Sequence, residues 1–339
     1  GIGAIPFSDA IMAQEEMLIP NNKSVVWVWL GGGPTQFETF HAPTQQVPDP
    51  YKPVSDVVTH KNGLAFGGLF KELIKQGDNL TAINSFSHGD SSHRQATHWM
   101  MTGHRNPKRE NTADSVATSR FSERKGLLKS LDSPGRVVSQ DAESFSKIGN
   151  TAYNVILGNA KDAFDLDQEP EAMREMYGKG GIGDQMLLAR RLSQFGTKFV
   201  TVHYGGWDMH GNIKKALEGK VPPLDKALAA FVKDIYQSGM SDDTLLVVTG
   251  EFGRTRLNGN AGRDHWPSIT PMLLSGGKYD HGRVIGKADK SYVPTDNKIG
   301  PIDVAATLFD HFEIDNKIQR TDQGGRPRYL LEGDGKLFL

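Results

Sequence analysis

One sixteen-residue stretch of this chain, 88–103, carries three histidines, one aspartate and two serines. It directly follows an apolar run, 80–86, that predicts a β-strand. Loops after strands are where α/β proteins place their chemistry, and imidazole, carboxylate and hydroxyl groups bind metal ions or attack esters. His88 and Asp90 are therefore candidate metal ligands. The alternative is a polar loop that caps a helix, with Asp90 or Ser91 at the N-cap.

Two further side chains of this stretch are candidate catalytic groups. Ser92 is a candidate nucleophile if a base or a metal ion activates it, although an unactivated serine is the commoner state. His93 follows it directly. Arg94, the next residue, could stabilise negative charge that develops on a reacting group.

Other polar segments also follow predicted strands. Asp208-Met-His210 comes after the run 198–204, and a loop can aim both side chains at one ion. Asp208 as a helix cap with an exposed His210 is the alternative. Ligands of open α/β sheets gather at the carboxyl ends of the strands, so these segments should meet in one crevice.

The remaining candidates lie near the ends of two more segments. Glu251 follows the run 243–249, where a buried charge must be paired or bound to metal. Arg254 either pairs with Glu251 or clamps a tetrahedral anion. In Asp264-His265, the histidine is the expected ligand and the aspartate its outer support. The neighbouring tryptophans, Trp207 and Trp266, are expected to wall the pocket.

Strands that alternate with helices must position these side chains. The run 24–30 predicts a buried central strand that stops at Gly31-Gly-Gly-Pro34, and 270–275 predicts another strand. Apolar spacing predicts helices over 64–76, 183–195, 222–239 and 301–312. The alternation predicts an α/β fold, a three-layer sandwich with a mostly parallel central sheet.

Composition narrows the classes of function. The chain has 339 residues, a formal net charge of −1 and no cysteine. No global field draws it to nucleic acid, no apolar run could span a membrane, and any metal must use nitrogen and oxygen ligands. Residues 1–22 are expected to form an N-terminal segment and 23–339 a single domain, with a basic insertion near 104–149. The start, 1–13, reads either as the end of an export signal or as an ordinary terminus.

The motifs together resemble the bacterial family of unknown function 1501, often described as sulfatase-like. They are the 88–103 stretch, Gly-Gly-Trp-Asp-Met-His-Gly-Asn (205–212), Gly-Glu-Phe-Gly-Arg-Thr (250–255) and Ala-Gly-Arg-Asp-His-Trp-Pro (261–267). The family in turn is similar to the alkaline phosphatase superfamily, so the resemblance implies an alkaline-phosphatase-like fold. It also implies a twin-arginine export signal upstream and hence a periplasmic or extracellular location.

That resemblance implies roles for individual residues. Ser92 or His93 would occupy the nucleophile region, and Asp208, His210 and His265 would form one metal site with Glu251 near a second. Two departures stand out. Glu251-Phe-Gly253 lacks the histidine of the superfamily's Asp-His-Gly, and the carboxylate expected at Gly31–Gly33 is missing, with Glu38 the nearest substitute.

The expected function is hydrolysis of a phosphate or sulfate ester, small or glycan-borne, with a divalent metal ion (Zn, Ca, Mg or Mn). Arg254 and Arg94 would stabilise the developing charge. The alternative is a degenerate, non-catalytic relative that binds a sulfated or phosphorylated glycan or a protein partner. A third possibility is a phosphotransferase of the mutase kind.

Overall fold

The computed structural model describes residues 22–45, 51–103, 160–315, 317–321, 327–329, 331 and 333–339. All of these except 160–162 belong to a single unit of the chain. The predicted insertion near 104–149 and residues 1–21 of the predicted N-terminal segment lie outside the described residues.

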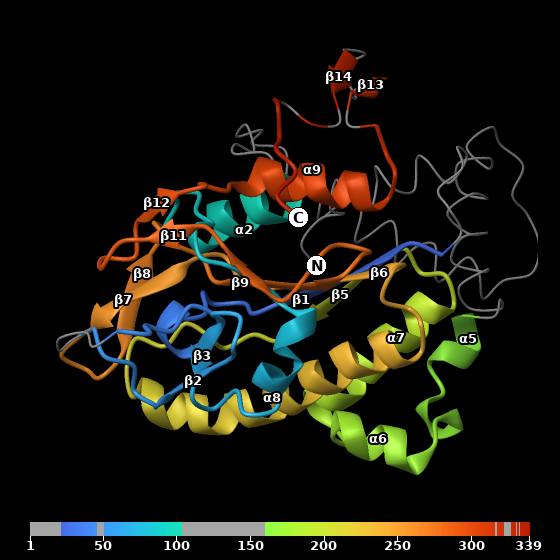
Figure 1. The fold of residues 1–339 in the computed structure, drawn as a ribbon, viewed down its shortest axis with the longest axis horizontal. Helices are drawn as coiled ribbons and strands as arrows, with labels where there is room; N and C mark the ends of the chain where they lie inside the picture. Colours follow the sequence, from blue (N-terminus) through green and yellow to red (C-terminus); the bar gives the residue numbers. More distant parts are fainter. Residues whose placement is uncertain are drawn as a thin grey trace, which may run out of the picture. The chain divides into compact units, whose positions relative to one another are not determined.

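A six-stranded sheet organises the described residues (Figure 1), in the order β10-β4-β9-β6-β1-β5. Its strands are β1 (Ser24–Trp29), β4 (Thr81–Ile83), β5 (Phe199–His203), β6 (Thr244–Thr249), β9 (Met272–Gly276) and β10 (Arg283–Ile285). The pairings β1–β5, β1–β6 and β4–β10 are parallel, whereas β9 is antiparallel to both β4 and β6. The prediction of a mostly parallel central sheet is therefore confirmed.

Two apolar clusters cover the two faces of this sheet. Along β1, Val26 and Val28 belong to one cluster and Val25 and Trp27 to the other, because successive strand side chains point to opposite faces. The first cluster includes α7 (Gly181–Gln194) and α8 (Ile213–Gln237), and the second includes α9 (Pro301–His311). Figure 1 shows α7 and α8 below the sheet and α9 above it, which gives the predicted three layers.

The other elements are short. The remaining helices and 3₁₀ turns are η1 (Gln36–Glu38), η2 (Leu73–Asn79), α2 (His93–Thr102), α5 (Ala160–Ala163), η3 (Leu166–Gln168) and α6 (Glu171–Tyr177). The remaining strands pair as hairpins: β2 (Val57–Thr59) with β3 (Ala65–Gly67), β7 (Gly253–Leu257) with β8 (Arg263–Trp266), β11 (Lys287–Ala288) with β12 (Pro294–Asp296), and β13 (Gln319–Thr321) with β14 (Pro327–Tyr329).

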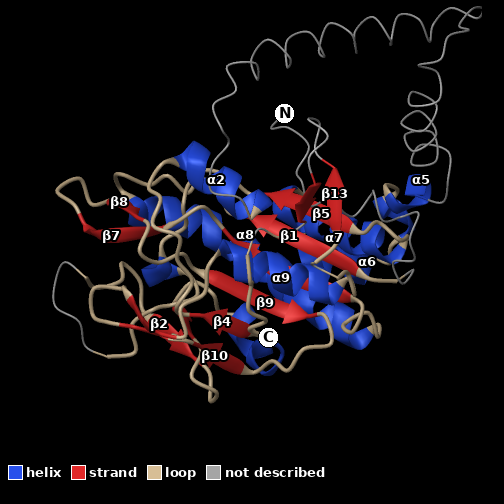
Figure 2. Cartoon of the chain, turned by 90° about the horizontal axis from the view of Figure 1, so that it is seen from above, coloured by secondary structure: helices blue, strands red, loops and turns tan. Residues whose placement is uncertain are grey.

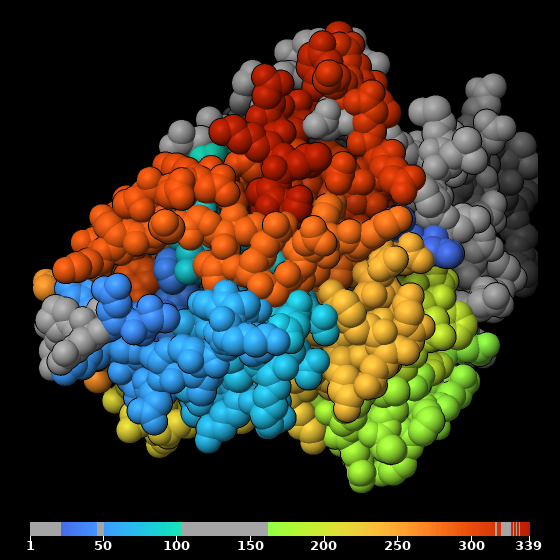
Figure 3. Space-filling view, viewed as in Figure 1, coloured from blue at the N-terminus to red at the C-terminus, as the bar shows by residue number. Residues whose placement is uncertain are grey.

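The helix predicted over 64–76 is wrong. The structure has β3 and then η2 in this region. A Cβ on Gly67 would lie 2.3 Å from the carbonyl oxygen of Glu38, so this glycine allows two backbone segments to touch. The tertiary contact overrides the helical spacing of the apolar residues. In Figure 3 the light-blue atoms of this part of the chain reach the surface, although most of its residues are buried. The backbone N–H groups of Glu72 and Leu73 donate to Asp225 of α8.

Helix α8 begins nine residues before the predicted start at Pro222, at Ile213, and holds Pro222 and Pro223 in its interior. Both prolines are exposed, while Leu217, Val221 and Leu224 are buried on the opposite side. An apolar face that runs unbroken past the prolines stabilises the helix despite their missing N–H groups. Among the described residues, no helix combines the length and apolar character that a bilayer crossing requires.

His311 of α9 makes the stability of the fold depend on pH. It is 3 % exposed, and its Nε2 donates to the carbonyl oxygen of Ser24 at 2.9 Å. Burial lowers its pKa from 6.5 to about 4. His311 has a lower pKa in the folded state than in the unfolded state. The free energy of unfolding is therefore highest above pH 6.5 and decreases as the pH falls towards 4.

We expect this residue to reduce the free energy of unfolding by about 3 kcal/mol between pH 7 and pH 4. Urea unfolding of metal-free protein at pH 7, 5 and 4 measures the loss. A His311→Gln variant should show a shallower dependence on pH. An identical slope in the variant and the parent would contradict the assignment.

Candidate metal centre

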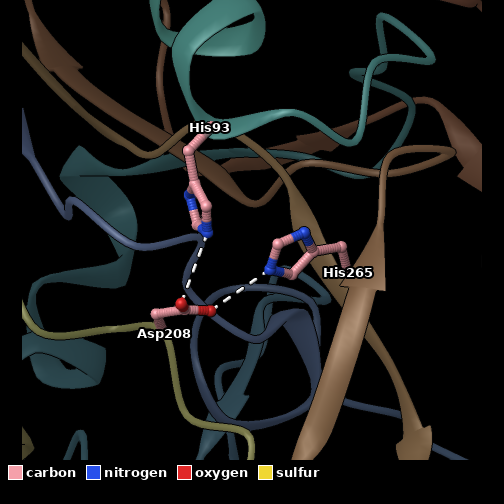
Figure 4. Close-up of side chains that lie close together, drawn as sticks. All are labelled: His93, Asp208 and His265. Atoms are coloured by element: carbon pink, nitrogen blue, oxygen red, sulfur yellow. Dashed lines mark hydrogen bonds and ion pairs between the residues drawn. The ribbon is translucent and has the colours of Figure 1, made fainter.

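Three histidines and one aspartate from three distant segments meet at one end of the sheet. Figure 4 shows the imidazoles of His93 and His265 pointing at the carboxylate of Asp208. The ligand atoms of these three residues all lie within 4.8 Å of one another. His210 joins them, with its Nε2 2.9 Å from Asp208 Oδ1 and 3.2 Å from His265 Nε2. We call His93, Asp208, His210 and His265 the histidine cluster.

Strand ends and one hairpin position the cluster. Asp208 and His210 lie in the loop between β5 and α8, His93 is the first residue of α2, and His265 lies on β8. Figure 2 shows β7, β8 and α2 towards the same end of the molecule. The carboxyl ends of parallel strands meet at one edge, as the sequence analysis expected.

Each imidazole of the cluster uses its Nδ1 to bind an acceptor. His93 Nδ1 faces Oε1 of Glu251 at 2.8 Å, and His210 Nδ1 faces Oδ1 of Asp264 at 2.9 Å. His265 Nδ1 faces the carbonyl oxygen of Ser91 at 2.9 Å. Carboxylate and carbonyl oxygens only accept, so each Nδ1 carries the proton and each Nε2 of a neutral ring presents a lone pair.

These lone pairs face one another and the carboxylate of Asp208. His265 Nε2 lies 3.2 Å from Asp208 Oδ1, and His93 Nε2 lies 3.4 Å from Asp208 Oδ2. Within the described part of the chain, the buried Nε2 of His93 has no hydrogen-bond partner. Acceptors that face acceptors repel unless a cation lies between them, and metal-binding histidines commonly donate their other N–H to a carboxylate or carbonyl.

The donor set and its spacing fit a divalent ion. Ligands at 2.0–2.1 Å from a tetrahedral zinc ion lie about 3.3 Å from one another. The contacts among Asp208, His210 and His265 measure 2.9–3.2 Å. The cluster is also open to solvent, because the side chains of Asp208 and His210 are nearly half exposed.

Asp208 is held as a carboxylate. Partial burial raises its pKa, but the hydrogen bond and charge of Arg254 outweigh burial and lower the pKa to about 2. Oδ1 of Asp208 accepts from Nη2 of Arg254 at 2.6 Å. An anionic oxygen is therefore present at every ordinary pH, which is what a metal ligand requires.

Glu251 lies behind His93 rather than beside the three Nε2 atoms. Its Oε1 also accepts from the backbone N–H of Gly32 at 2.7 Å, and its side chain is 4 % exposed. In this position Glu251 orients His93. Asp264 orients His210 in the same way, whereas the sequence predicted that it would support His265.

A Glu251→Gln variant should bind zinc about 10–100-fold more weakly, because an amide replaces the carboxylate that fixes His93. Isothermal titration with zinc after chelator treatment measures the affinity. Glu218→Gln, an exposed acid on α8, is the matched control and should not change it. If Glu251→Gln binds zinc as tightly as the parent, Glu251 does not orient His93 for metal binding.

Several predicted site residues lie outside the cluster. Both ring nitrogens of His88 are used within the protein: Nδ1 accepts from the Asp90 N–H at 3.1 Å, and Nε2 contacts the carbonyl oxygen of Glu251. Burial lowers the pKa of His88. Oδ1 of Asp90 accepts from the N–H of Ser92 at 2.9 Å. His88 and Asp90 thus shape the loop before α2.

Ser92 and Arg94 flank His93 at the start of α2. Ser92 is the exposed N-cap, and Arg94 is exposed in the first turn. Among the described residues, none makes a hydrogen bond with the hydroxyl of Ser92. The N-terminal end of a ten-residue helix thus lies beside the cluster, and such an end attracts anions.

Glu38 and the two tryptophans do not reach the cluster. Glu38 is 2 % exposed, and its Oε1 accepts from Nη2 of Arg263 at 2.7 Å. Trp207 is buried in the core, and its Nε1 donates to Tyr204. Trp266 and Arg254 line a separate pocket of about 170 Å³, whose lining includes no residue of the histidine cluster.

Sequence reasoning missed the backbone groups that complete the site. The N–H of Gly32 and the carbonyl oxygen of Ser91 carry no side-chain signal, although the glycine run 31–33 marked a backbone-exposing loop. Gly32 has a φ of 113°, and a Cβ there would lie 2.4 Å from the backbone nitrogen of Asp208. Only glycine lets these two loops approach so closely.

The fold and site define an α/β sandwich with a histidine-rich candidate metal centre at the carboxyl ends of its parallel strands. The chain belongs to the family described as "Protein of unknown function (DUF1501)", which matches residues 22–153 and 110–338. No curated protein sequence matches the chain.

Similar solved structures include three from bacteria. The lipoteichoic acid synthase LtaP from Listeria monocytogenes has 14% identity and a TM-score of 0.41, covering 87% of this chain and 73% of its own. An alkaline phosphatase superfamily protein from Vibrio parahaemolyticus has 14% identity and a TM-score of 0.41, with coverage of 88% and 68%. The sulfatase PsFucS1 from Pseudoalteromonas sp. has 11% identity and a TM-score of 0.39, with coverage of 92% and 72%.

Proposed function

We propose that this protein is a metal-dependent hydrolase of phosphate or sulfate esters. The observation that carries the proposal is the set of contacts made by the ring nitrogens of the histidine cluster. His93, His210 and His265 each commit Nδ1 to an acceptor and direct Nε2 at Asp208. This arrangement matches the outer hydrogen bonds of known metal-binding histidines.

Zinc, or another ion that favours imidazole, fits this donor set best. Three ring nitrogens and one carboxylate suit zinc and its neighbours, whereas magnesium and calcium prefer oxygen ligands. Of the four ions that the sequence left open, zinc is therefore our choice. When bound, such an ion acts as a Lewis acid and makes bound water acidic enough to serve as a nucleophile near neutral pH.

The residues around the cluster supply the rest of the chemistry. Glu251 and Asp264 fix the orientation of His93 and His210. The N-terminal end of α2 and Arg94 provide positive potential beside the cluster, which favours an anionic ester and the charge that develops on it. Ser92, directly before His93, is a second candidate nucleophile. Among the described residues, no basic group contacts its exposed hydroxyl.

The substrate class and location are part of the same proposal. We propose a small-molecule or glycan ester as substrate, with neither nucleic acid nor membrane as a partner, and a periplasmic or extracellular location through a twin-arginine signal. What supports these points is the pattern of motifs, the near-neutral charge and the exposure of the cluster.

Zinc content and turnover test the function together. Protein purified without chelator should contain zinc and hydrolyse p-nitrophenyl phosphate or p-nitrophenyl sulfate, and chelation should abolish turnover while zinc restores it. Metal-free protein that gains no activity with zinc, manganese, magnesium or calcium would refute the proposal.

A non-catalytic binding protein is the second candidate. The observation that favours it is the engagement of Arg254, whose side-chain N–H groups are directed at protein acceptors rather than at solvent. The anion clamp expected at this residue is therefore absent from the described site. A protein that binds zinc and a sulfated oligosaccharide but turns over neither ester would support this candidate.

A further inference from the structure

The guanidinium of Arg254 lies in a buried cage of oxygen atoms beside the histidine cluster. The side chain is 1 % exposed. Nε donates to the carbonyl oxygen of Gly33 at 2.8 Å, and Nη1 donates to that of Arg263 at 3.0 Å. Nη1 also lies 3.5 Å from Nε2 of His210. Nη2 donates to the carbonyl oxygen of Gly32 and to Oδ1 of Asp208.

This cage has the composition of a cation site. Three backbone carbonyls and one carboxylate oxygen are the ligands that a hard divalent ion takes. Burial lowers the pKa of Arg254, and the charges of Asp208 and Glu251 oppose that effect. The guanidinium remains protonated at any ordinary pH, so it is a permanent cation in this cage.

The formal charges around the histidine cluster are neutralised by one divalent ion but not by two. Three carboxylates contact the cluster or its histidines: Asp208, Glu251 and Asp264. Arg254 offsets one of these three negative charges and leaves a formal charge of −2, which one divalent ion neutralises. A second divalent ion would leave +2 in a site that holds a buried guanidinium, and like charges at short range repel strongly.

We propose that Arg254 is a built-in cation that makes the histidine cluster a one-ion centre. It occupies the oxygen cage next to Asp208 and donates to Oδ1 of Asp208. Arg254 is thus a positioning residue for the metal ligand Asp208. This inference rests on the proposed metal centre and adds its stoichiometry and the reason for it.

The first test measures how many zinc ions the parent protein binds. Titration of chelator-treated protein, checked by elemental analysis after dialysis, should give one ion per chain. Two ions per chain would overturn the one-ion inference and leave the proposed function standing. No bound ion would overturn both, because the metal centre itself would then be missing.

The second test asks whether the guanidinium acts through its charge and shape. Arg254→Ala should weaken zinc binding about 10–100-fold, the usual cost of losing a partner of a ligand. Millimolar guanidinium chloride should restore the affinity by filling the emptied cage. Unchanged zinc affinity in Arg254→Ala, or a loss that guanidinium cannot repair in a folded protein, would overturn the positioning role.

Two further variants serve as a control and a replacement in this test. Arg256→Ala changes an exposed arginine on the same strand, β7, and should keep both stoichiometry and affinity. If Arg254→Ala fails to fold, Arg254→Lys takes its place, since lysine keeps the charge but not the planar fork. It should retain one ion with weakened affinity, and parent-like affinity would overturn the role of the fork.

Discussion

Asp208→Ala is expected to abolish zinc binding and ester hydrolysis together. Asp208 contributes the carboxylate of the cluster, and its two oxygens contact His93, His210, His265 and Arg254. Loss of a direct ligand should weaken zinc binding by more than the factor of about 10–100 that loss of an outer partner costs. Zinc titration and p-nitrophenyl ester turnover measure the two effects.

Two further variants separate metal binding from folding. Asp208→Asn keeps the shape and can still accept from Arg254, so it should fold like the parent and yet bind zinc poorly. Asp280→Ala removes an exposed aspartate away from the cluster and should leave both properties intact. Full zinc content and full turnover in Asp208→Ala would rule out the cluster as the metal centre.

Glu38→Gln is expected to destabilise the protein by about 3–5 kcal/mol without weakening zinc binding. Its carboxylate accepts from Arg263 at 2.7 Å, and both side chains are at most 1 % exposed. Replacing Glu38 with a neutral amide leaves the charge of Arg263 buried without a counter-ion. Urea unfolding measures the loss of free energy, and zinc titration of the folded variant shows whether the centre is intact.

An exposed ion pair gives the comparison for Glu38. Lys61 and Asp78 form an ion pair at 3.0 Å, and both side chains are well exposed. Asp78→Asn should therefore cost no more than about 1 kcal/mol. A large drop in zinc affinity for Glu38→Gln would instead support Glu38 as the missing carboxylate ligand that the sequence suggested.

The convergence of several candidate ligands could be anticipated from the sequence because their segments come near the ends of predicted strands. The strand-end rule predicted that Asp208, His210 and His265 would meet, and the structure brings them together at 2.9–3.2 Å. His93 was expected in the nucleophile region, and the structure adds it to the cluster. The ligand role proposed for His93 could not be assigned from the sequence, because the direction of an imidazole depends on which acceptor Nδ1 contacts.

Other features depend on contacts between distant segments. The pairing of Glu38 with Arg263 spans 225 positions, and no local pattern around either residue indicates it. The hairpin of β7 and β8, which carries Arg254 and His265, lacks a regular alternation of apolar residues and was not predicted. Propensity also misplaced the start of α8, since burial of one helix face outweighs the two prolines within it.

The contact between Gly32 and the backbone of Asp208 has a consequence for how the centre works. Since two loops touch there without an intervening side chain, the backbone that carries the Asp208 carboxylate is fixed in the folded protein. An arriving ion then has little chain to order, so the entropic penalty of binding is largely met during folding. Such pre-organisation would favour tight binding of the ion that the proposed centre takes.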